Sequence, residues 1–172
     1  MKLYSILLFQ KFQDGQKPKL LKEVHDLKEL SFFQKGPFKE SAELAGQLLA
    51  EKAGTSSLTR EKWGGDASES GYFIHCCINK DNLAGICITD ADYHQYAFKM
   101  LTKIMEDFSN TISPSSWNTI KDSTSCNYSK LPEFLKKWQN PCEADSQNDE
   151  YDEILKEIRR INEYDEILKE IR

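Results

Sequence analysis

The most reactive combination of side chains in the sequence is a histidine followed by two cysteines, His75-Cys76-Cys77. A cysteine nucleophile needs a base within hydrogen-bond reach and an accessible, electropositive setting. The surrounding residues predict a strand, and neighbouring side chains of a strand point to opposite faces. We therefore do not expect His75 to act as a base for Cys76 or Cys77. Buried cysteines that fill the core are the interpretation we adopt, with no catalytic residue.

Patterns that bind metals or cofactors are missing from the sequence. There is no Cys-x-x-Cys or His-x-x-x-His spacing, and the three histidines are scattered at positions 25, 75 and 94. The Gly64-Gly65 pair lacks the spacing of a phosphate-binding loop. Acidic residues near position 150 lack the alternation and the central glycine of a calcium loop. The sequence thus predicts no metal site, no cofactor and no enzymatic activity.

Composition limits which other classes of protein and partner are possible. The 172 residues suffice for one domain and a short appendage, and the formal net charge of −5 argues against nucleic acid as a partner. Five cysteines without framework spacing indicate reduced thiols and the cytosol. The apolar run at residues 3–9 is too short to span a bilayer, and no cleavage site follows it. We therefore expect membrane association only through a partner or a lipid.

Hydrophobic patterning predicts an alternation of strands and helices. The predicted strands span residues 3–9, 19–26, 58–63, 72–78 and 83–89, and the predicted helices run from Pro37 to near Gly54, from Asp90 or Asp92 to Phe108, and from Leu131 to Trp138. The first strand should place Leu3, Leu7 and Phe9 on one face and Tyr4, Ile6 and Leu8 on the other. Tight turns between most strands favour an antiparallel sheet with helices on both faces.

The first helix carries more apolar surface than one stripe requires. Its main stripe is Phe38, Ala42, Ala45 and Leu49, and Leu44 and Leu48 widen it. Two interpretations stay open. Either the whole stripe packs on the sheet, or Leu44 and Leu48 lie at the edge of a groove between helix and sheet.

The tail repeats itself. The ten residues 150–159, EYDEILKEIR, recur unchanged at 163–172. The offset of thirteen residues is neither a heptad nor a known solenoid period. Ile154, Ile158, Ile161, Leu168 and Ile171 fall on or near one stripe, so we expect an amphipathic helix that needs a partner.

Several blocks of the sequence resemble one known family. They are MKLYSILL at the start, SFFQ at 31–34, YFIHCCINKDNLAGICITDADY at 72–93, MEDFS at 105–109 and NPCEAD at 140–145. Together they are similar to the YKT-type R-SNAREs, which are prenylated synaptobrevin homologues with a longin domain. The resemblance covers about residues 1–145, and the NP-x-EAD block is specific to this branch.

The resemblance implies a fold class and a domain plan. The fold would be α/β (α+β) and profilin-like, a five-stranded antiparallel sheet with one helix on one face and two on the other. A longin domain would span residues 1–140, a linker 141–149, and a partial or altered SNARE-like helix 150–172. Family members act in vesicle membrane fusion, and they cycle from the cytoplasm to Golgi, endosomal or vesicle membranes.

The resemblance also implies a site. The longin domain of the family folds back onto the SNARE helix and the lipid tail, through a groove between the first helix and a neighbouring strand. We expect Phe32, Phe33, Leu44 and Leu48 to line it. Leu44 and Ser41 stand where the family has phenylalanines. The partners implied are SNARE helices, in the same chain and in fusion complexes, and a lipid chain.

The tail departs from the family pattern. Asp165 and Lys169 stand where apolar layers should precede a central arginine, so Arg172 is not assigned that role. A Cys-a-a-X prenylation signal is not part of this sequence, and membrane attachment through lipidation would need one. The alternative function is a longin-type trafficking adaptor or tether subunit that binds helices or small GTPases.

Overall fold

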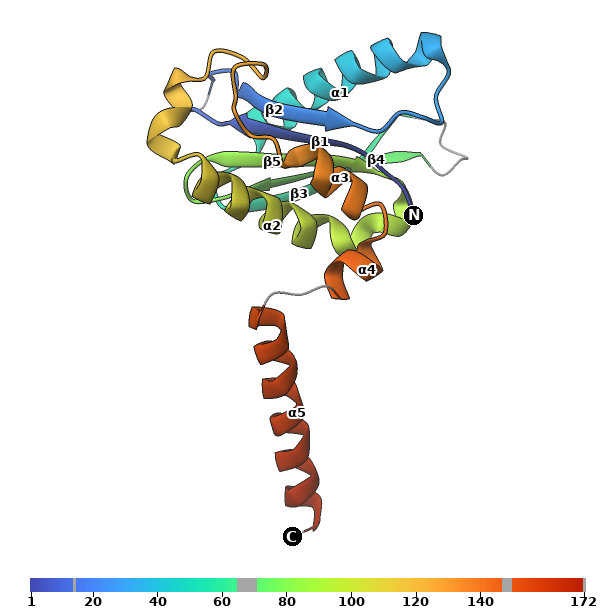
Figure 1. The fold of residues 1–172 in the computed structure, drawn as a ribbon, viewed down its shortest axis with the longest axis vertical. Helices are drawn as coiled ribbons and strands as arrows, with labels where there is room; N and C mark the ends of the chain where they lie inside the picture. The colour runs from blue at the N-terminus through green and yellow to red at the C-terminus, as the bar shows by residue number, and fades with distance from the viewer. Residues whose placement is uncertain (14, 65–70, 147–149, 172) are drawn as a thin grey trace. The chain divides into compact units, whose positions relative to one another are not determined.

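The computed structural model describes residues 1–13, 15–64, 71–146 and 150–171 (Figure 1). The chain divides into two compact units, Met1–Gln139 and Asn140–Arg172, named here the sheet unit and the tail unit. Each is described by itself.

The sheet unit is built on five antiparallel strands. They are β1 (Leu3–Gln10), β2 (Lys19–His25), β3 (Ser57–Trp63), β4 (Tyr72–Ile78) and β5 (Leu83–Thr89). Their order across the sheet is β2-β1-β5-β4-β3, so β1 and β5 are interior and β2 and β3 are edges. Every residue of β5 is buried, as expected for a strand that is apolar on both faces.

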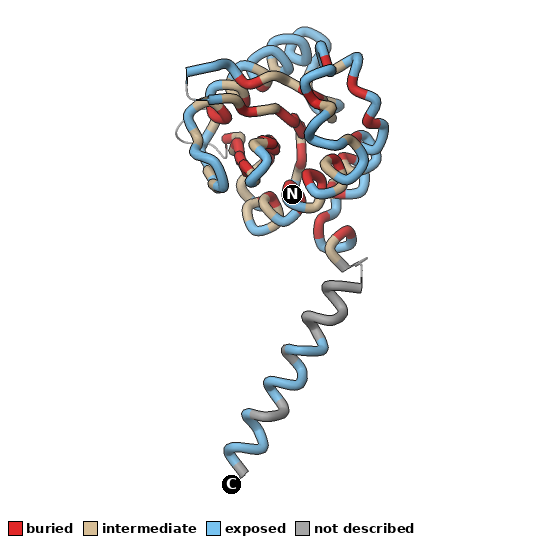
Figure 2. Tube along the Cα trace, turned by 90° about the vertical axis from the view of Figure 1, so that its left-hand side faces the viewer, coloured by how far each residue is buried: buried red, intermediate tan, exposed pale blue. Residues whose placement is uncertain are grey.

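Helices cover both faces of the sheet (Figure 1). One face carries α1 (Phe32–Lys52), and the other carries α2 (His94–Thr111) and α3 (Leu131–Lys137). Two 3₁₀ segments, η1 (Ala91–Tyr93) and η2 (Pro114–Thr119), flank α2. Buried residues gather between these layers (Figure 2). The predicted fold class, with one helix on one face and two on the other, is confirmed.

The core under α1 depends on a close approach of helix and sheet. Ala42, Leu49 and Ala50 pack with Leu7, Phe9 and Ile86 in one buried cluster. A Cβ added at Gly46 would lie 3.1 Å from the Phe9 ring, so a glycine suits this contact. At the C-terminal end of α1, Lys11 Nζ donates to the carbonyl oxygens of Ala50 and Glu51 at 2.9 and 2.8 Å. The helix is thereby tied down by backbone groups that its own hydrogen bonds leave free.

The predicted faces of β1 are wrong at its first residues. The register between β1 and β5 shifts between Leu3 and Ser5, so a bulge interrupts the alternation. As a result Tyr4 packs against the α1-side cluster that contains Leu7 and Phe9, and its ring centre lies 6.1 Å from that of Phe38. Strict alternation had placed Tyr4 on the opposite face.

The start of α1 also differs from the prediction. The helix begins at Phe32 rather than at Pro37, which lies inside it. Ser31 and Gln34 form a capping box, in which the Gln34 Oε1 accepts from the Ser31 N–H at 3.0 Å. Gly36-Pro37 suggested a later start, but Ser-x-x-Gln five residues earlier is the stronger signal. For the next helix, neither Asp90 at the N-cap of η1 nor the cap of α2 provides a side-chain hydrogen bond.

The tail unit contains two helices. Residues Pro141–Ser146, which fall within the predicted linker 141–149, form α4. Asn140 precedes Pro141, and its Oδ1 accepts from the Glu143 N–H at 3.4 Å, so proline and cap together favour a helical turn. Residues 147–149 of the predicted linker lie outside the described residues. The predicted tail helix is present as α5 (Glu150–Ile171).

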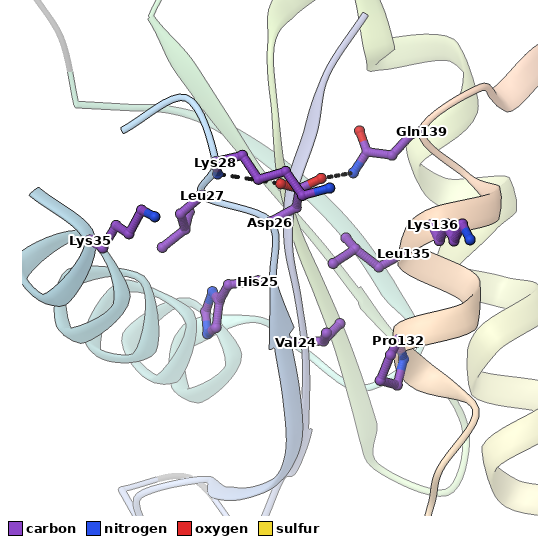
Figure 3. Close-up of a pocket in the computed structure, with 10 residues that line it drawn as sticks. All are labelled: Val24, His25, Asp26, Leu27, Lys28, Lys35, Pro132, Leu135, Lys136 and Gln139. Atoms are coloured by element: carbon purple, nitrogen blue, oxygen red, sulfur yellow. Dashed lines mark hydrogen bonds between the residues drawn. The ribbon is translucent and has the colours of Figure 1, made fainter. Parts of the chain in front are cut away.

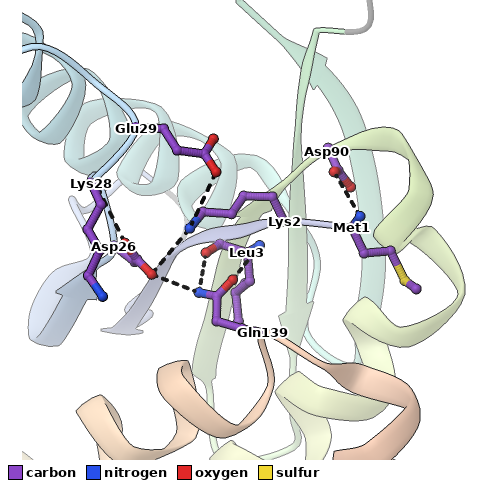
Figure 4. A network of polar contacts seen from close by, with 8 residues as sticks. All are labelled: Met1, Lys2, Leu3, Asp26, Lys28, Glu29, Asp90 and Gln139. Carbon is purple, nitrogen blue, oxygen red and sulfur yellow. Dashed lines mark hydrogen bonds and ion pairs between the residues drawn. The ribbon is translucent and has the colours of Figure 1, made fainter.

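The two ends of the sheet unit are joined by a polar network (Figure 4). The Gln139 side chain donates to the Leu3 carbonyl at 2.7 Å and accepts from the Leu3 N–H at 3.3 Å. Its Nε2 also lies 3.4 Å from Asp26, whose carboxylate pairs with Lys2 at 3.2 Å. The side-chain amide of Gln139 thus makes the pair of hydrogen bonds to Leu3 that a neighbouring strand would make.

Because this network is complete at Gln139, a chain truncated after Asn140 should fold by itself. We expect a single cooperative thermal transition, monitored by tryptophan fluorescence, with a midpoint within a few degrees of that of the full chain. All three tryptophans lie in the sheet unit, so they report on it alone. A broad, uncooperative melt of the truncated chain would show that residues beyond Asn140 belong to the core.

Candidate functional site

A groove runs between α1 and the edge strand β3, with a volume of about 420 Å³. Its apolar lining comes from α1, from the residue after it and from two strands: Ala45, Leu48, Leu49, Ala53, Trp63 and Ile74. Its polar lining is Lys52, Thr59, Glu61 and Lys62. The groove therefore offers an apolar wall with cationic and anionic groups beside it.

The local sequence explains this lining. Thr59, Glu61 and Trp63 alternate along β3, so their side chains share the face toward α1. On α1, Leu48 and Lys52 are one turn apart and lie on the same side of the helix. Because β3 pairs only with β4, nothing in the described sheet continues beyond it.

Trp63, which lines the groove, belongs to an aromatic cluster. Phe38 lies edge-on to Trp63 and Tyr72, with ring centres 5.2 and 5.3 Å away, and Tyr4 lies 5.0 Å from Tyr72. Burial, followed by the nearby charge of Glu29, raises the pKa of Tyr4 to about 12. These rings give a rigid wall, since aromatic pairs favour edge-on packing.

The sequence analysis did not identify Trp63 as a groove residue or Tyr72 as its aromatic neighbour. They face each other in the β3–β4 register. The available signal was an aromatic residue at the end of one predicted strand and another at the start of the next. Gly64-Gly65 indicated a turn between them, but the length of the segment 64–71 left the register of the two strands open.

The structure separates the predicted groove residues into two groups. Leu48 lines the groove and is 46% exposed, and Leu44 lies one turn before it with 58% of its surface exposed. Neither is packed into the core. Phe32 and Phe33 contact each other at the first turn of α1, are 84% and 86% exposed, and do not line this groove.

A second candidate site, around His75, is a structural network between the sheet and α2. The Arg60 guanidinium donates to His75 Nδ1 at 3.0 Å, and His75 Nε2 lies 2.8 Å from the Thr89 hydroxyl. The ring of Phe98 lies 4.8 Å from the guanidinium and completes the layer. Burial, and then the charge of Arg60, lowers the pKa of His75 to about 3, so the ring is neutral at physiological pH.

The cysteines beside His75 are poor nucleophiles. Burial raises the pKa of Cys76 to about 12 and also raises the pKa of Cys77 and Cys87. Because side chains alternate along a strand, His75 and Cys76 point to opposite faces of the sheet. His75 and Cys77 are two residues apart and share a face, so alternation alone does not keep them apart. What keeps His75 from acting on Cys77 is its engagement with Arg60 and Thr89 on both ring nitrogens.

A cavity of about 570 Å³ lies beside the other edge strand, between β2 and α3 (Figure 3). Val24 and Leu135 give it an apolar floor, and Lys28, Lys35 and Lys136 surround it. Its one carboxylate, Asp26, is already bound to Lys2 and Gln139. The cavity therefore combines an apolar floor with a rim of lysines.

A family model described as Longin, a regulated-SNARE-like domain, matches residues 27–135. The chain belongs to the longin family. A synaptobrevin homologue YKT6 of Dictyostelium discoideum is 30% identical to it over 84% of this chain and 70% of that protein. The synaptobrevin homologue YKT6 of Debaryomyces hansenii is 27% identical, over 85% of this chain and 70% of its own length. A VAMP-like protein, YKT61, of Arabidopsis thaliana is 24% identical, over 84% of this chain and 69% of its own length.

These similarities confirm the YKT-type longin R-SNARE resemblance. The longin chain is thus an R-SNARE of vesicle trafficking. Within the part of the chain that the structure describes, no helix combines the length and the apolar character needed to cross a bilayer.

Proposed function

We propose that this longin domain regulates vesicle fusion by holding an amphipathic SNARE helix, and a lipid chain attached to it, in the groove between α1 and β3. The observation that carries the proposal is the exposed apolar edge of this groove. Leu44 and Leu48 are half exposed, whereas Ala42, Leu49 and Ala50 of the same helix are buried in the core. Such surface on a monomer is typical of a partner site.

The shape of the groove suits a helix. Leu44 and Leu48 are four residues apart, so they form a ridge parallel to the axis of α1. A helix laid between this ridge and β3 would bury apolar anchors at its own positions i, i+3, i+4 and i+7, which is the usual mode of helix-in-groove recognition. Trp63 lines the groove and packs on Phe38 and Tyr72, so an aromatic ring is available there to contact an acyl chain.

The chain carries a helix with the corresponding features. In α5 the described apolar residues Ile158, Ile161, Ile167 and Leu168 are 41–55% exposed. Eight acidic and four basic residues lie between Glu150 and Ile171, so the helix is acidic overall. Lys52 and Lys62 line the groove beside one carboxylate, Glu61, so its charged lining has more cationic than anionic groups and suits an acidic helix. We therefore propose a SNARE-type helix, in the same chain or in a fusion complex, as the occupant.

The test is binding of a labelled SNARE helix from a YKT6 relative to the full chain and its variants. Leu48→Glu and Leu44→Glu each place a charge where an apolar anchor should be buried. Each anchor contributes roughly 1.5–3 kcal/mol, so affinity should fall about 10- to 100-fold. The fold should be retained, because both side chains are already exposed. A separate titration with a fatty-acyl detergent tests whether the groove also binds a lipid chain.

Leu58→Glu is the matched control. Leu58 is 62% exposed, lies on the same edge strand and does not line the groove. It should bind the helix as the parent does. Equal binding by all four proteins would place the helix elsewhere, and unfolding of Leu44→Glu would make Leu44 a structural residue.

The second candidate function, a trafficking adaptor or tether subunit, predicts a different result. The groove would then bind helices from other proteins, and α5 would not compete with them. Addition of an α5 peptide to the complex distinguishes the two functions, because only the autoregulatory longin domain should release the labelled SNARE helix. Cytoplasmic location with cycling to Golgi, endosomal or vesicle membranes follows from the R-SNARE proposal.

A further inference from the structure

A cluster of three metal-ligand side chains lies on the opposite edge of the sheet from the groove. Glu23 and His25 are two residues apart on β2, and Glu43 lies on α1. One ligand atom from each residue lies within 4.8 Å of the other two. Figure 3 shows His25 turned toward α1, on the opposite side of β2 from Val24.

Two atoms that face each other in this cluster are buried and lack a hydrogen-bond partner. The side chains of Glu23 and His25 are 11% and 10% exposed. Glu23 Oε2 and His25 Nε2 are among the buried polar atoms of the described chain that have no hydrogen-bond partner, and they lie 3.6 Å apart. Most buried polar atoms in proteins are hydrogen-bonded, so these two atoms require an explanation.

The charges of the cluster are also poorly balanced. Glu23 and Glu43 bring two carboxyl groups to one place, beside the His25 ring. One cation, Lys39, reaches Glu23, at 3.2 Å on the far oxygen Oε1. Two carboxylates and one imidazole thus converge without a central positive charge.

We propose that Glu23, His25 and Glu43 bind a zinc ion that joins α1 to the edge strand β2. Zinc bonds to nitrogen and oxygen of about 2.0–2.1 Å place tetrahedral ligand atoms roughly 3.3 Å apart. The 3.6 Å between His25 Nε2 and Glu23 Oε2 already approaches this value. Glu43 needs a side-chain rotation to reach the same centre, and water would complete the four ligands.

The surroundings of His25 support this assignment. Ser5 Oγ lies 2.7 Å from Nδ1 of the ring. When Nδ1 carries the proton and donates it to Ser5, the lone pair of Nε2 points toward Glu23, the arrangement found around metal-binding histidines. The imidazole favours zinc over calcium and magnesium, which take mainly oxygen ligands and more of them.

Sequence patterns could not show this site. Its ligands come from two elements and are 20 residues apart along the chain, so no short motif contains them. The prediction of no metal-binding residue relied on local spacing alone. The site would act on the groove indirectly, since Glu43 directly precedes Leu44 on α1.

Binding can be measured without any mutation of the cluster. The chain has only three histidines, so their imidazole nitrogens can be resolved by NMR during a titration with zinc. We expect the Nε2 signal of His25 to shift until one equivalent is reached, while the signals of His75 and His94 stay in place. Cys142 is exposed and offers a competing thiolate, so the experiment uses the Cys142→Ser protein.

Variants then test the ligand set. Glu43→Gln should weaken zinc binding at least tenfold, and Co²⁺ should lose the intense visible bands of a tetrahedral site. Glu40→Gln is the matched control, because Glu40 is exposed on the same helix one turn earlier and is not one of the three ligands, so it should weaken binding far less and keep the visible bands. An unmoved His25 signal at two equivalents of zinc, or equal binding by both variants, overturns the proposal. Because the NMR readout uses the unmutated cluster, this holds even if Glu43→Gln fails to fold.

Discussion

Phe108→Ala should destabilise the sheet unit by about 3–5 kcal/mol, the usual cost of removing a fully buried phenylalanine. Phe108 on α2 has no exposed surface. Its ring centre lies 5.0 Å from Tyr128 in an edge-on contact and 5.9 Å from Trp117. Substitution leaves a cavity between α2 and the segment that leads to α3, and the two aromatic neighbours cannot fill it without leaving their own contacts.

Phe98→Ala is the matched comparison on the same helix. Phe98 lies off the main apolar face, is only partly buried, and contacts Arg60 and the His75 ring at 4.8 and 5.8 Å. Its removal should cost about 1–2 kcal/mol, the loss of a cation–π contact and partial burial. Urea unfolding followed by tryptophan fluorescence gives both values. Equal destabilisation by the two substitutions would mean that the core face of α2 is misassigned.

The strands were predictable because local signals determine them. Residues 72–78 and 83–89 are apolar runs bounded by turn residues, and β4 and β5 have these same bounds. A bulge is different, because it arises from pairing with another strand. The shift that turns Tyr4 toward Phe38 depends on how β1 meets β5, about 85 residues later in the chain, and no local pattern encodes it.

The groove was predictable only in part. The spacing of Leu44 and Leu48 indicated apolar surface beyond the core stripe, and both residues are exposed. The contribution of Trp63 depends on β3 being an edge strand, which is a property of sheet order rather than of sequence. Phe32 and Phe33 are a different case. They came with the SFFQ block of the family resemblance, but they lie at the first turn of α1, 12 and 11 residues before Leu44.

The buried histidine of the α2 face makes stability depend on pH. The pKa of His75 is lowered from 6.5 to about 3 in the folded chain, first by burial and then by Arg60. At pH values between about 3 and 6.5, the unfolded chain binds a proton at His75 and the folded chain does not. Stability from this residue is therefore fully present above pH 6.5 and is lost as the pH falls toward 3.

His75→Gln should remove this dependence, because glutamine can still bond Arg60 and Thr89 but does not titrate. In the parent, His75 alone should lower the free energy of unfolding by about 1.4 kcal/mol for each pH unit below 6.5, and by roughly 4 kcal/mol at pH 3.5. The measurement is urea unfolding at a series of pH values between 7 and 4, read by tryptophan fluorescence. His94→Gln serves as the control, since the pKa of His94 is lowered by burial and Arg60 but its ring is more accessible. The free energy of unfolding of His94→Gln should depend on pH more nearly as that of the parent does. A His75→Gln slope identical to that of the parent would show that His75 becomes protonated in the folded chain, and that the Arg60–His75–Thr89 network opens at acid pH.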